Sequence, residues 1–448
     1  MPPRRSNRSS DLLPGETTVY EKGAVVLIAA IPMLAMAGYG SVDIWALIPL
    51  SILTIALLLL WAIDGLRAGE IRFNTSLMQV ALIGLVVIGC IQLLPLGGGP
   101  SGGSWSSLSM DAFATRGFTV RLLLLLIYFA AALTYLNGKR RVQHIVTAVI
   151  IFGSAMAFAG ILQKLTSPGA IYGLRPTPQA IPFGPFVNQH HFTAFMEMTV
   201  GLTLAMMLGS AVGRDRKALY LIALALMLIA ASMTGSRGGM IGLIATAGFV
   251  LVAVYASERS SAERTRSGLK IALGAVAVLV ITAFGVVYLS GADPLVRGIG
   301  LQSGQADVTS GRLHFWSVGL KIFLENPVIG AGFDAFGVAF TRFDTWNGYY
   351  RVEQAHNDYL QVLADGGILA FACVAAFLFL LGRRGIQVIR TSTSPARRSV
   401  AIGALAGCFG IAVHSIFDFP LRTPSNSYFF LLLAAFATVS LGDERERR

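Results

Sequence analysis

The chain has 448 residues, of which 54% are hydrophobic and only 13% are charged, whereas soluble domains usually carry about 25% charged residues. Apolar runs of about 17 to 25 residues, each long enough to cross a bilayer, recur along its whole length, so the composition excludes an ordinary soluble domain and predicts an all-α, polytopic membrane protein. The net charge of +12 does not indicate nucleic-acid binding, because basic residues gather in the cytoplasmic loops of membrane proteins and set their orientation.

Twelve membrane spans are predicted, arranged as a single membrane domain over residues 1–448. The first 22 residues are polar and basic, and no short apolar region with a small-residue cleavage site follows them, so the first span is expected to be a retained anchor. The predicted spans are 24–40, 44–63, 76–95, 119–136, 143–163, 190–211, 217–233, 238–256, 270–290, 358–382, 399–417 and 426–441. When the N-terminus is placed in the cytoplasm, every cytoplasmic loop carries Lys or Arg, so both termini are predicted to be cytoplasmic.

Two outer loops differ from the short links elsewhere. The stretch 97–107 is rich in Gly and Ser and is expected to be flexible. The loop 291–357 is long, and within it the segment SGRLHFWSVGLKIFLENP has the apolar periodicity of a helix, which Ser310 could cap and Asn326-Pro327 would end. The apolar residues of this segment are Leu313, Trp316, Leu320 and Leu324. We expect an amphipathic helix lying against the outer membrane face.

Arginines on the outer side need a cause other than orientation. They are Arg237, Arg312, Arg342, Arg351 and Arg422. Guanidinium groups bind phosphate through paired hydrogen bonds and keep their charge in low-dielectric surroundings, so two or three converging arginines would form a diphosphate site. Alternatively, such arginines contact lipid headgroups or pair with Asp334, Asp344 or Glu353. Arg237 fits this alternative least, because it lies between glycines in a very short link between buried helices, where charge is costly and usually functional.

His356 begins the stretch AHNDYLQVLADGG, which leads into the tenth span. If a helix begins near Asn357, then Asn357, Gln361 and Asp365 lie one turn apart on one face, and Asp358 joins them at the first turn. These residues form a polar stripe, which should face a cavity and not lipid. The free N–H groups of the helix start would favour a nearby anion. A neutral imidazole at this place could take a proton from a hydroxyl.

Other polar groups favour simpler interpretations. The other histidines on or near the outer side are His190, His191, His314 and His414. Their spacing matches no zinc motif, so no metal site is predicted. A lone histidine is more often a polar residue whose hydrogen bonds are satisfied within the protein than a catalyst. The stretch GAGFDAFG at 330–337 has the wrong spacing for a nucleotide-binding loop. Glu197, an acid within a span, is expected to make a polar contact between helices, although a proton relay is the alternative.

Several segments together resemble the O-antigen ligase/polymerase superfamily of bacterial envelope glycosyltransferases. The signature HNDYLQVLADGG is accompanied, in the order typical of that superfamily, by FGPFVNQHHFTAFMEM, TGSRGGMIGL, GRLHFWSVGLKIFLENPVIGAGFDAFG and HSIFDFPLRTPS. The likeness covers residues 180–430, which we define as the O-antigen ligase-related region. The first five spans match in topology alone.

The resemblance implies an all-helical, C-type glycosyltransferase-like membrane fold in the bacterial inner membrane, with 291–357 as a large periplasmic loop. It implies transfer of a glycan from undecaprenyl diphosphate, without metal or other cofactor, to the lipid A core in ligases or to a lipid-linked repeat unit in polymerases. By match to the superfamily pattern, Arg237 and Arg312 would contact the diphosphate and His356 would be catalytic. Asn357, Asp358, Gln361 and Arg422 would support them.

Other functions remain open at this stage. HNDYLQ together with FVNQHHF resembles exopolysaccharide polymerases somewhat more than lipopolysaccharide ligases, but the glycan and its acceptor are not defined. A transporter or flippase of lipid-linked glycans would also use arginines to bind diphosphate, although its polar residues should line a path through the membrane. A scaffold of an envelope complex is a third interpretation.

Overall fold

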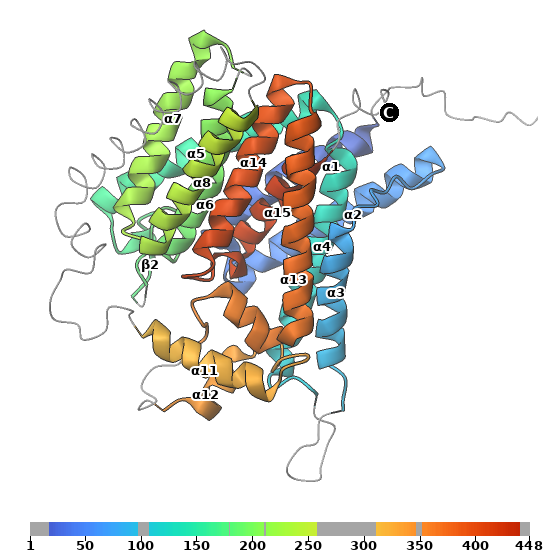
Figure 1. Ribbon diagram of the computed structural model, residues 1–448, viewed down its shortest axis with the longest axis vertical. Coiled ribbons are helices and arrows are strands. Elements are labelled where there is room, and N and C mark those ends of the chain that lie inside the picture. Colours follow the sequence, from blue (N-terminus) through green and yellow to red (C-terminus); the bar gives the residue numbers. More distant parts are fainter. Residues whose placement is uncertain are drawn as a thin grey trace, which may run out of the picture.

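The chain folds into a bundle of long helices, as the computed structural model shows for residues 18–96, 107–178, 180–209, 212–257, 311–345 and 352–439 (Figure 1). The helices are α1 Val19–Ala37, α2 Ile44–Ala68, α3 Met78–Gln92, α4 Ala112–Tyr135, α5 Lys139–Thr166, α6 Gln189–Leu208, α7 Arg214–Met233, α8 Arg237–Ser257, α11 Arg312–Glu325, α12 Phe336–Phe343, α13 Asp358–Thr391, α14 Pro395–His414 and α15 Pro424–Thr438. Sheet is limited, among these residues, to a hairpin of β1 Ala170–Ile171 with β2 Arg175–Pro176, in which Ala170 lies opposite Pro176.

The predicted all-α membrane architecture is confirmed. Nine helices of the described residues are long and apolar enough to cross a membrane, and α3 is a shorter apolar helix. All the predicted spans coincide with described helices except the ninth, 270–290, which lies outside the described residues. The predicted ends differ most at α13, which continues to Thr391 because Arg383, Arg384 and Gln387 extend the helix past its apolar part.

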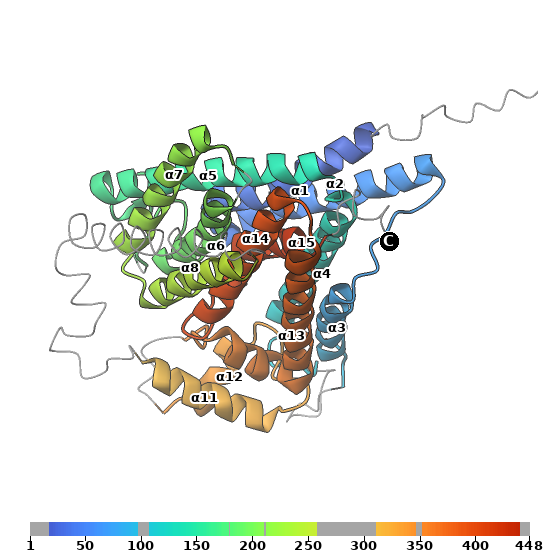
Figure 2. The ribbon, with the colours of Figure 1, turned by 45° about the horizontal axis from the view of Figure 1, so that its top comes forward.

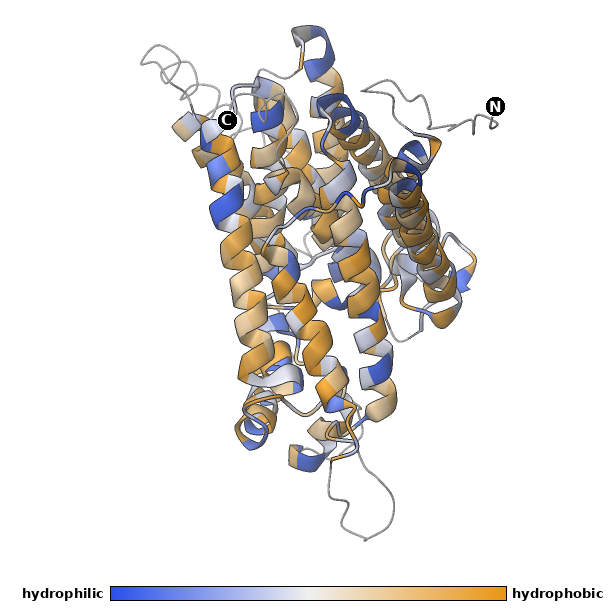
Figure 3. Cartoon of the chain, turned by 90° about the vertical axis from the view of Figure 1, so that its right-hand side faces the viewer, coloured by the Kyte–Doolittle hydropathy of each residue, from blue (hydrophilic) through white to orange (hydrophobic). Residues whose placement is uncertain are grey.

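Hydropathy follows the length of the bundle. Hydrophobic residues cover the middle of the upright helices, and hydrophilic residues gather towards their two ends (Figure 3). Many large apolar side chains point outward, among them Ile48 and Ile52 of α2 and Phe379 of α13. Exposed apolar surface of this kind is costly in water but is satisfied by lipid, so the molecule is a multi-pass membrane protein.

Helices α6 and α14 form the centre of the bundle, because most of their apolar residues are buried within the protein. Small residues allow this close packing. A Cβ atom at Gly201 of α6 would lie 2.8 Å from the carbonyl oxygen of Gly403 in α14. Glycines at such contacts are typical of membrane helices, which associate by close van der Waals packing.

The long outer loop forms the two helices α11 and α12, which lie across one end of the bundle near the start of α13 (Figure 2). Helix α11 was predicted and ends at Asn326 as expected, but Gly311 occupies its N-cap position, and Ser310 lies outside the described residues. Helix α12 was not predicted. The side chains of Leu313, Leu320 and Leu324 are exposed, as contact with a membrane face would require.

Helix α13 is interrupted at Gly367, whose φ of 66° and ψ of −167° are not helical. The backbone of the loop before α12 replaces the helical hydrogen bonds at this break. The N–H of Gly332 donates to the carbonyl of Asp365 at 3.0 Å, and the N–H of Ile368 donates to the carbonyl of Pro327 at 2.8 Å. The stretch GAGFDAFG therefore anchors the outer loop to α13, and Gly367 is required because side chains rarely adopt this conformation.

Candidate active site

His356 lies two residues before the first residue of α13, and the start of α13 lies at the end of the bundle covered by α11 and α12 (Figure 2). Its φ of 51° is left-handed, which is uncommon for a residue with a side chain and occurs often at functional sites. Asn357 caps α13, because its side-chain oxygen accepts hydrogen bonds from the N–H groups of Tyr359 and Leu360, both at 3.0 Å. The cap fixes the start of the helix and thereby the position of His356.

Asp418 is the acceptor that orients His356, and the sequence analysis did not identify it. The His356 Nδ1 and Asp418 Oδ1 atoms are 3.2 Å apart, and the N–H of Phe419 also donates to Asp418 Oδ1 at 2.9 Å. Burial would raise the pKa of Asp418, but the hydrogen bond from His356 and the charges of His190, His191 and His356 hold it below its usual range. Asp418 is therefore a carboxylate that only accepts, so His356 Nδ1 carries the proton and Nε2 is left as the basic atom.

Two aromatic rings hold the imidazole of His356 in place. The Phe419 ring meets it edge-on with centroids 4.8 Å apart, and the Phe315 ring of α11 stacks on it at 6.0 Å. The His356 side chain remains 31% exposed. One edge of the ring is thus fixed by protein while the rest can reach a substrate.

Arg237 starts α8 immediately after the tight link that follows α7. Gly235 has a φ of 67°, and the Ser236 hydroxyl accepts the N–H of Gly239 at 3.1 Å, which caps the helix. The same hydroxyl lies 2.8 Å from Nδ1 of His190. The link therefore contacts the start of α6 through Ser236 and His190, and Arg237 follows it directly as the first residue of α8.

Arg312 belongs to the same group of charges. Burial lowers its pKa, the carboxylate of Asp418 opposes that shift, and the nearby charge of Arg237 adds to it. The guanidinium groups of Arg237 and Arg312 are thus close enough to repel each other, and Arg312 also lies close enough to Asp418 to be attracted by its carboxylate. Arg312 thus lies near Arg237 and near Asp418, the partner of His356, and the direct roles that the resemblance implies for Arg237, Arg312 and His356 stay predictions.

Arg422 occupies a different position, within a network of ion pairs. Its guanidinium lies 2.7 Å from Asp334 Oδ1 and also pairs with Asp365, and Arg121 lies 2.6 Å from Asp334 Oδ2. Burial would lower the pKa of Arg422, but the charges of Asp365 and Asp334 raise it above its usual value. Two carboxylates already neutralise Arg422, so it joins the outer loop to α13 in the described structure.

The polar stripe on α13 faces protein and not lipid. Gln361 and Asp365 are fully buried; Gln361 Oε1 accepts the N–H of Ala355 at 2.6 Å, and its Nε2 donates to Asp365 at 3.1 Å. The expectation that free N–H groups at this helix start attract an anion is wrong. The Asn357 side chain accepts hydrogen bonds from two of these N–H groups, and the N–H of Asp358 donates to the carbonyls of Ser415 and Asp418.

The carboxylate of Asp358 is used locally as well. It accepts the Ser415 hydroxyl at 2.9 Å and the N–H of Leu421 at 3.3 Å, so it ties the start of α13 to the link between α14 and α15. That link contains Asp418. Asp358 thus positions the partner of His356.

The remaining predicted polar residues have protein partners. His191 Nδ1 lies 2.7 Å from the Thr423 hydroxyl. Arg342 pairs at 3.3 Å with Glu325, an acid that was not among the alternative partners considered for the outer arginines. Glu197 and His414 form a fully buried pair at 2.8 Å between α6 and α14, which confirms the polar interhelix contact. Arg351 lies outside the described residues, within which no group of three metal-ligating side chains gathers.

A cavity of about 180 Å³ runs from Asp358, at the start of α13, along that helix. Polar residues contribute to its lining, namely Asp358, Tyr359, Ser415, Arg422 and Ser427. The other lining residues are apolar, including Phe377 of α13 and Phe430 of α15. A cavity with one polar end and a long apolar wall suits an amphiphile whose polar group stays near His356.

Comparison with known families gives a match over about a third of the chain. Residues 222–375 match the family model described as O-antigen ligase. The matched region contains Arg237, Arg312 and His356 but ends before Asp418. A search of curated proteins found no match to the chain.

Proposed function

Because the chain belongs to the O-antigen ligase superfamily and is thus a glycosyltransferase-like membrane enzyme, we propose that it transfers a glycan from undecaprenyl diphosphate to an acceptor hydroxyl on the periplasmic side of the inner membrane. The observation that carries the proposal is the arrangement around Asp418. His356 hydrogen-bonds to Asp418 at 3.2 Å, and Arg312 lies close enough to both Asp418 and Arg237 for their charges to shift its pKa.

In the proposed reaction, Nε2 of His356 takes the proton of the acceptor hydroxyl as its oxygen attacks the anomeric carbon. A new carbon–oxygen bond forms, the bond from the anomeric carbon to the diphosphate oxygen breaks, and undecaprenyl diphosphate leaves with both bonding electrons. Asp418 stabilises the imidazolium that results, because it accepts the hydrogen bond of Nδ1. A base positioned in this way typically contributes about 10²–10⁴-fold to the rate.

Arg237 and Arg312 would stabilise the negative charge that builds on the departing diphosphate. Guanidinium groups form short, charge-assisted hydrogen bonds to phosphate oxygens, and fixed positive groups aimed at a developing charge are often the largest single contribution to catalysis. A bound diphosphate would also relieve the repulsion between these two arginines. Asn357 and Asp358 act as positioning residues in this proposal, since their side chains bond to the backbone and to Ser415.

The cavity along α13 supports a lipid-linked donor. Its polar end includes Asp358, two residues after His356, and its apolar wall continues towards the middle of the bundle. We assign this cavity to the first part of the polyprenyl tail. The periplasmic placement rests on the basic residues, because α13 has His356 before its first residue and Arg383, Arg384 and Arg390 near its other end.

The test is transfer by the purified chain in proteoliposomes with an undecaprenyl-diphosphate-linked glycan. Wild type should form product, and His356→Ala should lose it, whereas His314→Ala, a histidine paired with Asp344 in the same loop, should keep most of the activity. Supplying donor alone or donor with lipid A core separates a polymerase from a ligase. Normal activity of His356→Ala would contradict the proposal.

A further inference from the structure

His190 has no part in the reaction proposed above, yet its imidazole lies at the candidate active site. It is the second residue of α6, and 28% of its side chain is exposed. Its Nδ1 atom lies 4.0 Å from Asp418 Oδ2, whereas His356 bonds to the other oxygen of that carboxylate. Asp418 therefore has an imidazole near each of its two oxygens, one from the start of α6 and one from the residue that precedes Asn357.

His190 also holds the link between α7 and α8. Its Nδ1 atom lies 2.8 Å from the hydroxyl oxygen of Ser236. That hydroxyl accepts the N–H of Gly239 at 3.1 Å and thereby caps α8, whose first residue is Arg237. Because Ser236 is only 1% exposed, water cannot readily replace His190 as its partner.

The two distances from Nδ1 of His190 describe different contacts. The 2.8 Å to Ser236 is a hydrogen-bond distance, whereas the 4.0 Å to Asp418 is a close approach beyond hydrogen-bond range. A hydroxyl can donate or accept, so either neutral tautomer of His190 keeps the bond to Ser236. The hydrogen bond thus fixes the ring, and the fixed ring lies between the cap of α8 and Asp418.

The start of α6 is itself held in place. Asn188 caps this helix, because its side-chain oxygen accepts the N–H of His190 at 2.8 Å. One turn further, the hydroxyls of Thr193 and Thr234 lie 2.7 Å apart, so α6 contacts the same link a second time. Thr193 is fully buried, and of these two contacts it is the one through His190 that also reaches Asp418.

We propose that His190 is a positioning residue for glycan transfer, which holds the start of α8, and with it Arg237, in place beside Asp418. The ring would join two parts of the site that come from different helices, the arginine assigned to the leaving diphosphate and the carboxylate that orients the base. This inference rests on the proposed function. It assigns His190 no contact with substrate, because its action passes through Ser236.

The test compares variants of His190 that keep a polar group at different atoms. The amide of Asn is attached to Cγ, where His carries Nδ1, whereas the amide of Gln lies one bond further, near the position of Nε2. In proteoliposomes with the lipid-linked donor, His190→Ala and His190→Gln should lose about 10–100-fold in transfer rate, as expected for a lost hydrogen bond and a small displacement of Arg237. His190→Asn should stay within about threefold of wild type, because it can still bond to Ser236.

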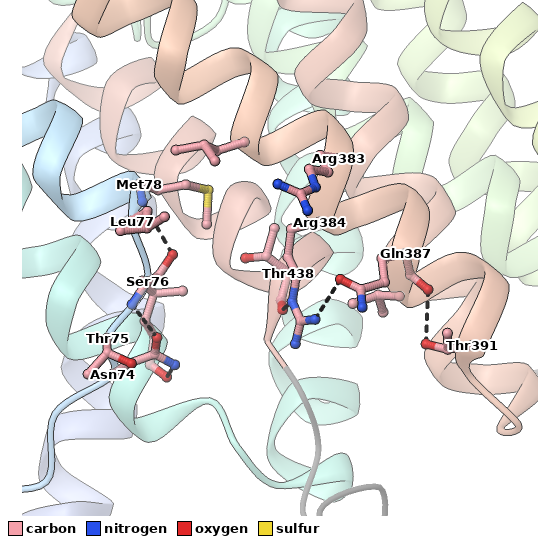
Figure 4. Close-up of a pocket in the computed structure, with 13 residues that line it drawn as sticks. Asn74, Thr75, Ser76, Leu77, Met78, Arg383, Arg384, Gln387, Thr391 and Thr438 are labelled. Atoms are coloured by element: carbon pink, nitrogen blue, oxygen red, sulfur yellow. Dashed lines mark hydrogen bonds between the residues drawn. The ribbon is translucent and has the colours of Figure 1, made fainter. Parts of the chain in front are cut away.

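Two control variants separate positioning from a general loss of structure. Thr193→Val keeps the size of the side chain but removes the other contact of α6 with the link. Gln387→Ala removes an acceptor of Arg384, 2.9 Å away, near the far end of α13 (Figure 4). Both controls should stay within about threefold of the wild-type rate. Thermal unfolding shows which variants fold, and if His190→Ala does not, the Asn and Gln variants decide.

The outcomes distinguish this inference from the function on which it rests. The positioning role is overturned if Gln recovers the rate at least as well as Asn, or if Thr193→Val loses as much as His190→Gln. A wild type that transfers glycan, beside an inactive His356→Ala and a fully active His190→Ala, removes the role of His190 alone. A wild type that shows no transfer contradicts the proposed function and this inference together.

Discussion

Replacing Asp418 with Asn should slow glycan transfer by about 10²-fold without unfolding the protein. Asn keeps the shape of the side chain but removes the charge that would stabilise protonated His356. At 3.2 Å between Nδ1 and Oδ1, Coulomb's law gives about 5 kcal/mol at an effective dielectric constant of about 20 and about 1.3 kcal/mol in water. Asp418 is 2% exposed and His356 31% exposed, so we expect an intermediate loss. A loss of about 3 kcal/mol corresponds to roughly 10²-fold in rate.

The assay is the initial rate of transfer in proteoliposomes at saturating donor, with thermal unfolding as the check on folding. Asp344→Asn is the matched control, because Asp344 also pairs with a histidine, His314 at 2.8 Å, in the outer loop. The control should stay within about threefold of wild type, as expected for a side chain outside the site. Equal and nearly normal rates for both variants would refute the role given to Asp418.

Two further predictions concern stability and are measured by thermal unfolding in detergent. Arg422→Gln should destabilise the protein by about 3–5 kcal/mol, because it leaves Asp334 and fully buried Asp365 without their shared cation. The control Arg342→Gln breaks an exposed pair with Glu325 and should cost at most about 1 kcal/mol. Equal losses for the two variants would contradict a stabilising role of the Arg422 ion pairs. Gly242→Ala should lower the free energy of unfolding by about 1–3 kcal/mol, because the added Cβ would lie 2.4 Å from Glu197 Oε2. The control Gly248→Ala, on the same helix, places its Cβ where nothing lies within 4 Å and should be neutral or stabilising. A neutral Gly242→Ala would show that the Glu197–His414 pair is not tightly enclosed.

The membrane helices could be predicted because long apolar runs have few other solutions. Shorter or interrupted elements could not. Helix α12 has only eight residues. The break at Gly367 depends on two hydrogen bonds with residues far away in the sequence, since the carbonyl of Pro327 accepts one and the N–H of Gly332 donates the other. The sequence shows that Gly can adopt such a conformation but not that a distant loop will support it.

The candidate site was predictable only in part, for the same reason. His356 was singled out because a polar stripe follows it into an apolar span, and Arg237 because it lies between glycines in a very short link. The role of Arg312 came from the resemblance alone. The partner of His356 was missed, although Asp418 is an acid in the apolar stretch HSIFDFP, because the contact joins residues 62 positions apart. Arg422 resembled the other outer arginines in sequence, and only its contacts with Asp334 and Asp365 separate it from them.

The most direct measurement of the central claim is a double-mutant cycle on the transfer rate between Arg237→Gln and His356→Gln. If the guanidinium and the imidazole act on one bound substrate, each single variant should lose about 10²–10⁴-fold, and the double variant should be hardly slower than the slower single variant, because residues that act as a unit are not additive. A double variant slowed by the full product of the two single losses would show that the residues act independently.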